Sequence, residues 1–283
     1  MSDMLRAAAP VDVLPVMEQE RAEFVCFLAS LTADDVATPT ICDGWMVGDI
    51  AVHLLGCDLA FLSRNRDHKE STNGHADSWD DLLRGLDAFN QRWVTAGRFL
   101  STRLTAELLE VTGRLVAEFL EEVDPKAPGE TVSWAGPDPA AWWLVAAREF
   151  SERWVHHQQI RDALDRPGLN GPSFVAPVLA TAMHGVPPAY LEVDAPEQTT
   201  VAIDVTGRAG FSWAVRRDAE GWKLYEGLSR EATTRLTLDQ DTAWRFLMRM
   251  ATSANTRPRV TVDGDAAYAR PFFEAVSAIV RRT

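Results

Sequence analysis

Apolar residues recur at the spacing of a helix through the first 165 residues of the chain. Positions three and four apart on a helix share one face, so each such run predicts a helix with one buried side. The predicted helices cover residues 11–31, 47–67, 79–100, 106–123 and 140–164. Because the connections between them are short, this pattern favours an up-and-down helical bundle.

The pattern changes after residues 166–173, a Gly- and Pro-rich segment that is typical of a boundary between domains. Beyond a further helix at 174–185, apolar and polar residues alternate, which predicts strands. The predicted strands cover 200–207, 211–217, 221–227, 234–239 and 259–264, with helices at 240–251 and 266–280. We therefore expect a helical bundle at 1–168 and a smaller α+β domain with an antiparallel sheet at 169–283.

Composition narrows the classes of partner. The formal net charge of −13, from 41 acidic and 28 basic residues, opposes binding to a phosphate backbone, so we expect no nucleic-acid partner. The three cysteines, Cys26, Cys42 and Cys57, lack a CxxC spacing and favour a reducing compartment. The first residues lack the pattern of a signal peptide, and no run of about 18 apolar residues could span a bilayer. These features predict a cytoplasmic protein without a membrane partner. They do not bear on the oligomeric state, and both a monomer and a homodimer stay open.

Two predicted helices carry residue types that bind metals. Glu152 and His156 are four positions apart, so both side chains leave one face of their helix and could hold a single ion. His53, on another helix, could supply a third ligand and leave one coordination position open, as in catalytic zinc sites. Two simpler interpretations stay open, namely a Glu–His pair on a solvated helix face and a histidine within an apolar core. Spacing alone does not decide, because nothing in it ties His53 to Glu152.

A family resemblance bears on this choice. The segment WxVxDIxxHL at 45–54 is followed about a hundred residues later by ExWVHHQQIRxAL at 152–164. In this order the two segments resemble the mycothiol-dependent maleylpyruvate isomerase family, whose N-terminal part is a DinB-like four-helix bundle. The segments GWKLYEG, TRLTLD and VTVDGD are similar to the family's C-terminal module. The resemblance implies that His53, Glu152 and His156 bind a divalent metal, with Zn²⁺ expected, although nickel, cobalt or iron suits the same donors.

The resemblance also implies a chemistry. The thiol mycothiol would bind at the open metal position and be held there as a thiolate, ready to attack a small electrophile. Addition to a cis double bond, rotation and elimination would make the protein an isomerase, whereas a thiol that stays attached would make it an S-transferase, which we place slightly ahead. The alternatives are maleylpyruvate cis–trans isomerase proper, a metal-dependent hydrolase and a non-catalytic binding module.

An arginine of the C-terminal domain binds the substrate carboxylates in that family. Arg245 and Arg249, four apart on the predicted helix, are the candidates here, and we expect one of them to act as the catalytic arginine. Their uncertain match to the family's arginine is the reason for placing the transferase ahead.

Trp45 and Asp49 are the expected cofactor-binding residues. Trp45 is expected to cap the end of the bundle beside the site. Asp49 would either orient the imidazole of His53 or place negative charge at the helix N-terminus, and the sequence leaves both roles open. His157 is expected in a supporting or surface position.

The two cysteines near these segments have plainer expectations. Cys57, four residues after His53, is expected to pack as a small apolar residue. Cys42 is expected to have no role in the chemistry.

Overall fold

The protein, described by a computed structural model over residues 4–69, 79–132, 134–135 and 139–275, forms two compact units. One contains residues 14–124 and 153–169, and the other contains 125–152 with the described parts of 1–13 and 170–279. The sequence predicts a single break at 168/169, whereas the structure joins two further segments to the second unit. The N-terminal segment belongs there because it carries strand β1 (Arg6–Ala7), which pairs with the sheet.

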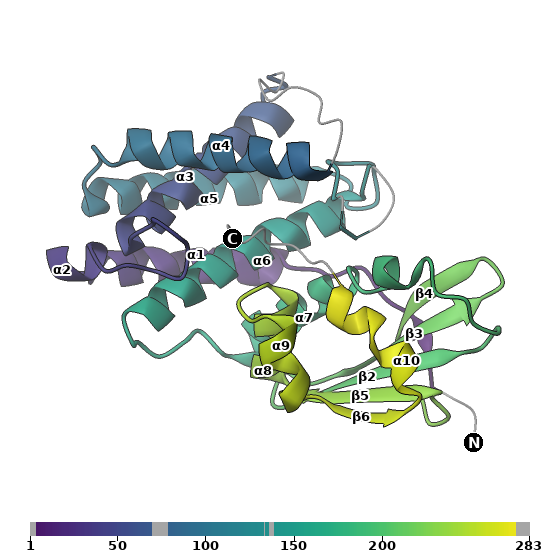
Figure 1. Cartoon of the computed structure of the whole chain (residues 1–283). Coiled ribbons are helices and arrows are strands. Elements are labelled where there is room, and N and C mark those ends of the chain that lie inside the picture. Colours follow the sequence, from purple (N-terminus) through teal and green to yellow (C-terminus); the bar gives the residue numbers. More distant parts are fainter. Residues whose placement is uncertain (1–3, 70–78, 133, 136–138, 276–283) are drawn as a thin grey trace. The chain divides into compact units, whose positions relative to one another are not determined.

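Long helices build the first unit. These are α1 (Leu14–Ala29), α3 (Val47–Asn65), α4 (Trp79–Gly97) and α5 (Thr102–Glu122), with the single-turn α2 (Ala33–Val36) between α1 and α3. The second half of α6 (Trp142–Ala163) completes the unit. Helix α5 packs against α1 and α3, and α3 packs against α4, so that α3, α4 and α5 run side by side (Figure 1). The predicted helical bundle is confirmed.

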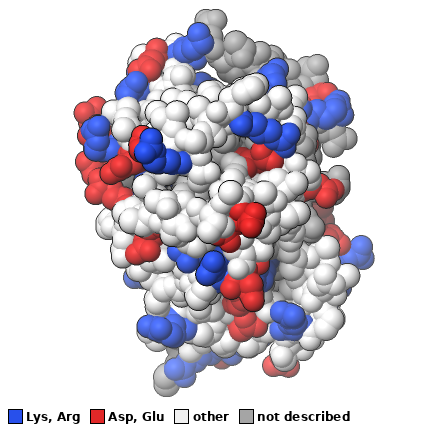
Figure 2. Space-filling view, turned by 90° about the vertical axis from the view of Figure 1, so that its left-hand side faces the viewer, with Lys and Arg blue, Asp and Glu red and all other residues white. Residues whose placement is uncertain are grey.

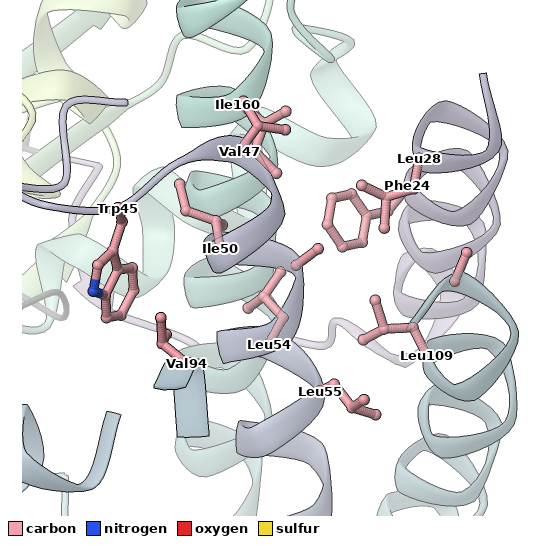
Figure 3. Packing of buried hydrophobic residues seen from close by; sticks show 12 residues of the cluster. Phe24, Leu28, Trp45, Val47, Ile50, Leu54, Leu55, Val94, Leu109 and Ile160 are labelled. Carbon is pink, nitrogen blue, oxygen red and sulfur yellow. The ribbon is translucent and has the colours of Figure 1, made fainter. Parts of the chain in front are cut away.

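One apolar cluster holds these helices together (Figure 3). Phe24 of α1 and Leu109 of α5 are buried in it, as are Ile50 and Leu54 of α3. Ile160 brings α6 into the same cluster. Since each such side chain contributes roughly 1.5–3 kcal/mol when it is buried, the cluster fixes how α3 lies against its neighbours.

The second unit is built on a six-stranded sheet with the strand order β1-β4-β3-β2-β5-β6. Its other strands are β2 (Thr200–Thr206), β3 (Ser212–Asp218), β4 (Gly221–Glu226), β5 (Thr234–Asp239) and β6 (Thr261–Gly264). The α+β class is confirmed. The expectation of a wholly antiparallel sheet is wrong for one pair, because β2 and β5 run parallel. The segment 227–233 carries the chain back to the end of the sheet where β2 starts, so β5 runs in the same direction as β2.

Helix α7 (Pro172–Met183) packs against α8 (Gln240–Leu247) in this unit. The other helical segments are short: α9 (Ser253–Thr256), α10 (Ala266–Ala269) and 3₁₀ turns at Pro187–Tyr190, Arg257–Arg259 and Pro271–Glu274.

Two predicted helix ends are wrong. The helix expected at 240–251 ends at Leu247. The helix expected at 266–280 stops before Pro271, whose ring cannot donate a helical hydrogen bond, and its last residues, 276–280, lie outside the described residues.

On the face of the molecule seen in Figure 2, Lys and Arg side chains stand among Asp and Glu side chains. None of the helices in the described part of the chain combines the length and apolar character that crossing a membrane requires.

Candidate metal centre

Helices α3 and α6 bring three potential ligands together. His53 of α3 and Glu152 and His156 of α6 each offer a ligand atom, and these atoms all lie within 4.8 Å of one another. The two imidazole rings are 4.8 Å apart between centroids and nearly perpendicular. His53 is 3% exposed and His156 5% exposed, whereas Glu152 is half-buried. Because one member of the Glu152–His156 pair is buried and the other half-buried, the interpretation of a pair on a solvated helix face is wrong. The sequence could not tie His53 to Glu152, and the fold does so.

The donor set fits a divalent cation. Two imidazole nitrogens and one carboxylate oxygen are the ligands of several catalytic zinc sites. Ligand atoms at about 2.1 Å from a tetrahedral ion lie roughly 3.4 Å from one another, so atoms within 4.8 Å need only small side-chain movements to share an ion. With three protein ligands, a fourth position is left for water or a substrate atom.

The ring of His53 lies between an aromatic and a thiol side chain. The Trp45 ring centroid is 5.0 Å from that of His53, and the indole Nε1 donates to Gln91 Oε1 at 3.4 Å. The Cys57 Sγ atom lies 3.7 Å from His53 Nε2. Trp45 is buried, so it forms an apolar wall beside the candidate ligand.

Asp49 lies in the first turn of helix α3. Its Oδ2 accepts a hydrogen bond from the backbone N–H of Met46, and both of its oxygens accept from the guanidinium of Arg98. Burial raises the pKa of the Asp49 carboxyl, but the hydrogen bonds from Arg98 and Met46 outweigh burial and lower that pKa below its ordinary value. Of the two roles that the sequence left open, these contacts favour negative charge at the helix N-terminus.

A second pair of contacts reaches His156 from outside the ligand set. His156 Nδ1 lies 2.7 Å from Gln159 Oε1, and the Cys42 thiol donates to the same oxygen over 3.2 Å. The sequence interpretation did not single out Gln159. Its spacing was a usable signal, because residues three positions apart on a helix lie on neighbouring parts of one face. The sequence predicts no role for Cys42, but the structure connects its thiol to a candidate ligand through the side chain of Gln159.

A neighbouring side of α6, about 100° around the helix from His156, is also polar and buried. His157 is fully buried, so a surface position for it is wrong. Its Nδ1 lies 3.0 Å from Glu20 Oε1 of α1, and its Nε2 accepts from Arg161 Nε at 2.9 Å. Because Nε2 accepts a hydrogen bond, the proton lies on Nδ1 and points at the carboxylate. His157 therefore anchors α6 to α1 and has no nitrogen left for the ion.

One turn earlier, Arg153 joins a buried ion cluster. Asp58 of α3 accepts hydrogen bonds from Arg153, from Arg21 of α1 and from Thr112 of α5. Burial raises the pKa of Asp58, but the charges of Arg21 and Arg153 and the hydrogen bonds outweigh it and lower the pKa to about 2. The carboxylate is therefore ionised in the folded protein at neutral pH and holds four helices.

These helices are also where the chain matches a known family. The family model described as the mycothiol maleylpyruvate isomerase N-terminal domain matches residues 17–161, which is just over half of the chain. The chain belongs to this family. The matched segment contains all three members of the candidate metal centre, as well as Trp45 and Asp49. No curated protein matches the chain.

Solved structures extend the family's fold to most of the chain. The crystal structure of a mycothiol-dependent maleylpyruvate isomerase has a TM-score of 0.50 at 10% identity and covers 88% of this chain and 91% of that one. A histidine-to-alanine mutant of such an isomerase gives a TM-score of 0.48 at 10% identity, with the same coverage. Sterol carrier protein 2 like 2 from Aedes aegypti is 16% identical with a TM-score of 0.27 and covers 34% of this chain and 94% of its own. The first comparison supports a helical part followed by a sheet part.

The two candidate arginines lie beyond the family match, and the structure separates their environments. Arg245, in α8, pairs with Asp241 at 3.0 Å and stacks over the Trp244 ring. Arg249 is not on that helix, which corrects the expected i,i+4 arrangement. Its backbone is left-handed with a φ of 57°, and its N–H and that of Met250 close the helix end on Phe246 and Arg245.

This helix end is a Schellman motif, and Arg249 occupies the position where glycine is usual. The Arg249 side chain is half-buried, and burial lowers its pKa. No hydrogen bond, ion pair or ring contact joins its guanidinium to any of the described residues. Arg249 is therefore strained and partly desolvated.

Proposed function

We propose that the protein is a metal- and thiol-dependent enzyme that uses mycothiol, or a similar small thiol, to isomerise or to conjugate a small electrophile. The proposal rests on one observation. His53, Glu152 and His156 offer ligand atoms within 4.8 Å of one another, and all three lie in the segment that matches the family. Mycothiol as the thiol, and isomerisation as the reaction, are suggested by the names of the family and of the solved isomerase. Two buried imidazoles and a half-buried carboxylate would supply the means of activating that thiol.

The three side chains would hold one divalent cation, and Zn²⁺ suits two imidazoles and a carboxylate. When bound there, such a cation lowers the pKa of a coordinated thiol so that it reacts as a thiolate at neutral pH. The protein's own contribution is to keep the two imidazoles buried and oriented and to exclude water with the Trp45 ring. Trp45 is then the residue that we propose to contact the thiol cosubstrate. Asp49 would not contact the thiol; it would act indirectly, by fixing the start of the helix that carries His53.

Arg249 is the residue that we propose to bind the substrate. The Arg249 guanidinium has no partner among the described residues, so it can donate two parallel hydrogen bonds to a carboxylate, and its half-buried position strengthens them. A non-glycine residue in a left-handed conformation costs about 1–2 kcal/mol, and such strain is tolerated most often where a side chain is needed for function. Arg245 is a poorer candidate because Asp241 already neutralises it.

The test combines metal content with product analysis on the full-length protein. Purified protein should contain about one zinc per chain, and His53→Ala, Glu152→Ala and His156→Ala should each lose metal and activity while the fold persists. The control is His68→Ala, because His68 is exposed and lies beyond the end of α3. Equal metal content in His53→Ala and in the control would reject the ligand assignment.

Substrates then separate the possible reactions. With mycothiol and maleylpyruvate, formation of the trans isomer with the thiol regenerated identifies an isomerase. With mycothiol and a chlorinated aromatic electrophile, a stable thiol conjugate identifies an S-transferase. Substrate cleavage in the absence of any thiol would contradict the proposal and favour a hydrolase, in which water is the nucleophile. If neither substrate turns over while metal and mycothiol bind, the protein is a binding module.

A further inference from the structure

A relay of two side chains connects the loop before α3 to the candidate ligand His156. The Gln159 amide oxygen lies 2.7 Å from His156 Nδ1 and receives the Cys42 S–H at 3.2 Å. Cys42 is itself fixed, because its N–H donates to Thr40 Oγ1 and its carbonyl accepts from the N–H of Trp45. The amide of Gln159 is therefore held between a fixed loop and the imidazole, and it is 5% exposed.

The chemistry of the amide oxygen decides where the proton of His156 lies. A carbonyl oxygen only accepts hydrogen bonds, so Nδ1 must carry the hydrogen, and in the neutral ring Nε2 then carries the lone pair. An imidazole binds a metal through the nitrogen that has no proton, and its other N–H is usually held by a neighbouring acceptor. The hydrogen bond to Gln159 thus leaves the Nε2 lone pair of His156 able to bind an ion, even in the metal-free protein.

We infer that Gln159 is a positioning residue that keeps His156 in its Nδ1–H tautomer, and that the Cys42 thiol orients the Gln159 amide for this task. The inference rests on the proposed metal centre but concerns the metal-free protein as well. Cys42 and Gln159 both lie outside the ligand set, so their proposed roles do not follow from the family match. A purely structural role for Gln159 is the competing explanation, because a buried amide must find hydrogen-bond partners in any case.

Gln158 provides a matched control for that explanation. It is the adjacent residue on α6, it is 1% exposed, and its Oε1 accepts from the backbone N–H of Leu169 instead of from a ligand. Replacing either glutamine by leucine removes a buried amide from the same helix. Only the change at position 159 removes the acceptor from His156.

The first experiment reads the tautomer directly in the metal-free, full-length protein labelled with ¹⁵N-histidine. The His156 signals, assigned by their absence from His156→Ala, should show Nδ1–H in the wild type, in Gln158→Leu and in Gln159→Glu, which keeps an acceptor. Gln159→Leu should shift His156 towards the Nε2–H form. A wild-type protein with Nε2–H would overturn the inference without recourse to any variant.

The second experiment measures zinc affinity against a competing chelator. Loss of such an acceptor usually costs about 10–100-fold in metal affinity, so Gln159→Leu should bind Zn²⁺ more weakly by that factor, while Gln159→Glu should bind at least as well as the wild type. Cys42→Ala should weaken binding by a smaller factor, which Cys42→Ser restores. If Gln159→Leu does not fold, Gln159→Met serves as the second variant. Equal affinities for the position-159 variant and Gln158→Leu would overturn the inference.

The two proposals can fail separately. If the wild type binds no metal, the proposed function fails, but the tautomer experiment still gives its own result. If metal binds and His156 keeps its tautomer in Gln159→Leu, only the role of Gln159 fails.

Discussion

Arg153 follows Glu152 directly on α6, and its guanidinium reaches Asp58 of α3, with Nη2 2.5 Å from Oδ1. Asp58 lies five residues after His53 on the same helix. One member of the ion pair is therefore adjacent in sequence to the candidate ligand Glu152, and the other lies little more than one helical turn after His53. A shift of α3 along α6 would break a fully buried ion pair before it separated His53 from Glu152. We infer that this pair fixes the register on which the metal centre depends.

Removing the Asp58 charge should damage both the fold and the metal centre. Asp58→Asn leaves Arg21 and Arg153 buried without their counter-charge, which should lower the free energy of unfolding by roughly 3–5 kcal/mol. Urea unfolding should show this loss, and chelator competition should show weaker zinc binding although Asp58 is not a ligand. Glu118→Gln, which removes an exposed pair with Arg114, is the control and should change the stability by less than about 0.5 kcal/mol. Unchanged zinc affinity in folded Asp58→Asn would contradict the register argument.

The same carboxylate predicts how the protein responds to acid. The pKa of Asp58 is lowered from 3.8 to about 2 on folding, so its contribution to stability is complete above about pH 5 and is lost as the pH falls towards 2. A shift of that size corresponds to about 2 kcal/mol. The difference in unfolding free energy between the wild type and Asp58→Asn should be constant from pH 7 to about pH 5 and shrink below pH 4. A difference that stays constant down to the lowest pH at which both fold would show that Asp58 does not titrate in this way.

Metal should stabilise the fold through the three ligands. A ligand that binds only the folded state at 100 times its dissociation constant adds about 2.7 kcal/mol, so Zn²⁺ should raise the melting temperature of metal-free wild-type protein. Calorimetry should show the same rise for His68→Ala and little or none for His53→Ala or His156→Ala. A rise that persists in both ligand variants would place the ion elsewhere.

Arg249 should trade stability against activity. Arg249→Gly removes the strain of the left-handed conformation and should stabilise the protein by about 1 kcal/mol. The same change removes a charged contact worth about 1.5–3 kcal/mol to an anionic substrate, so kcat/KM should fall by roughly 10–100-fold. Arg245→Ala, whose side chain is already paired, should have little effect on kcat/KM. Equal activity of Arg249→Gly and the wild type would exclude Arg249 from substrate binding.

The sequence predicted most helices and strands because their apolar periodicity is strong, and it failed at a helix end, at a very short strand and at one strand pairing. The helix expected to reach residue 251 ends at Leu247 because the chain turns left-handed at Arg249, and no glycine marks that turn. Strand β1 is only two residues long, too short for alternation to reveal it. The parallel pairing of β2 with β5 depends on where a loop returns, which local pattern does not encode.

The sequence could indicate the candidate ligand residues, but it could not predict the buried ion pairs that hold their helices together. Glu152 and His156 share a helix face by spacing alone, but only the fold brings His53 to them. Asp58 stands in an otherwise apolar stretch of α3, which hints at a buried partner without naming Arg21 or Arg153. Those partners lie on other helices, so nothing in local spacing connects them.

The pairing of Arg6 and Ala7 with Glu226 and Tyr225 has a practical consequence for anyone who cuts the gene in two. A fragment that begins at residue 169 would expose the outer edge of β4, whose backbone groups could then recruit a second copy in place of the missing strand. A soluble sheet fragment therefore needs the N-terminal segment supplied in trans or joined by a short linker. Residues near the start of this sequence complete a sheet whose other strands come from its second half.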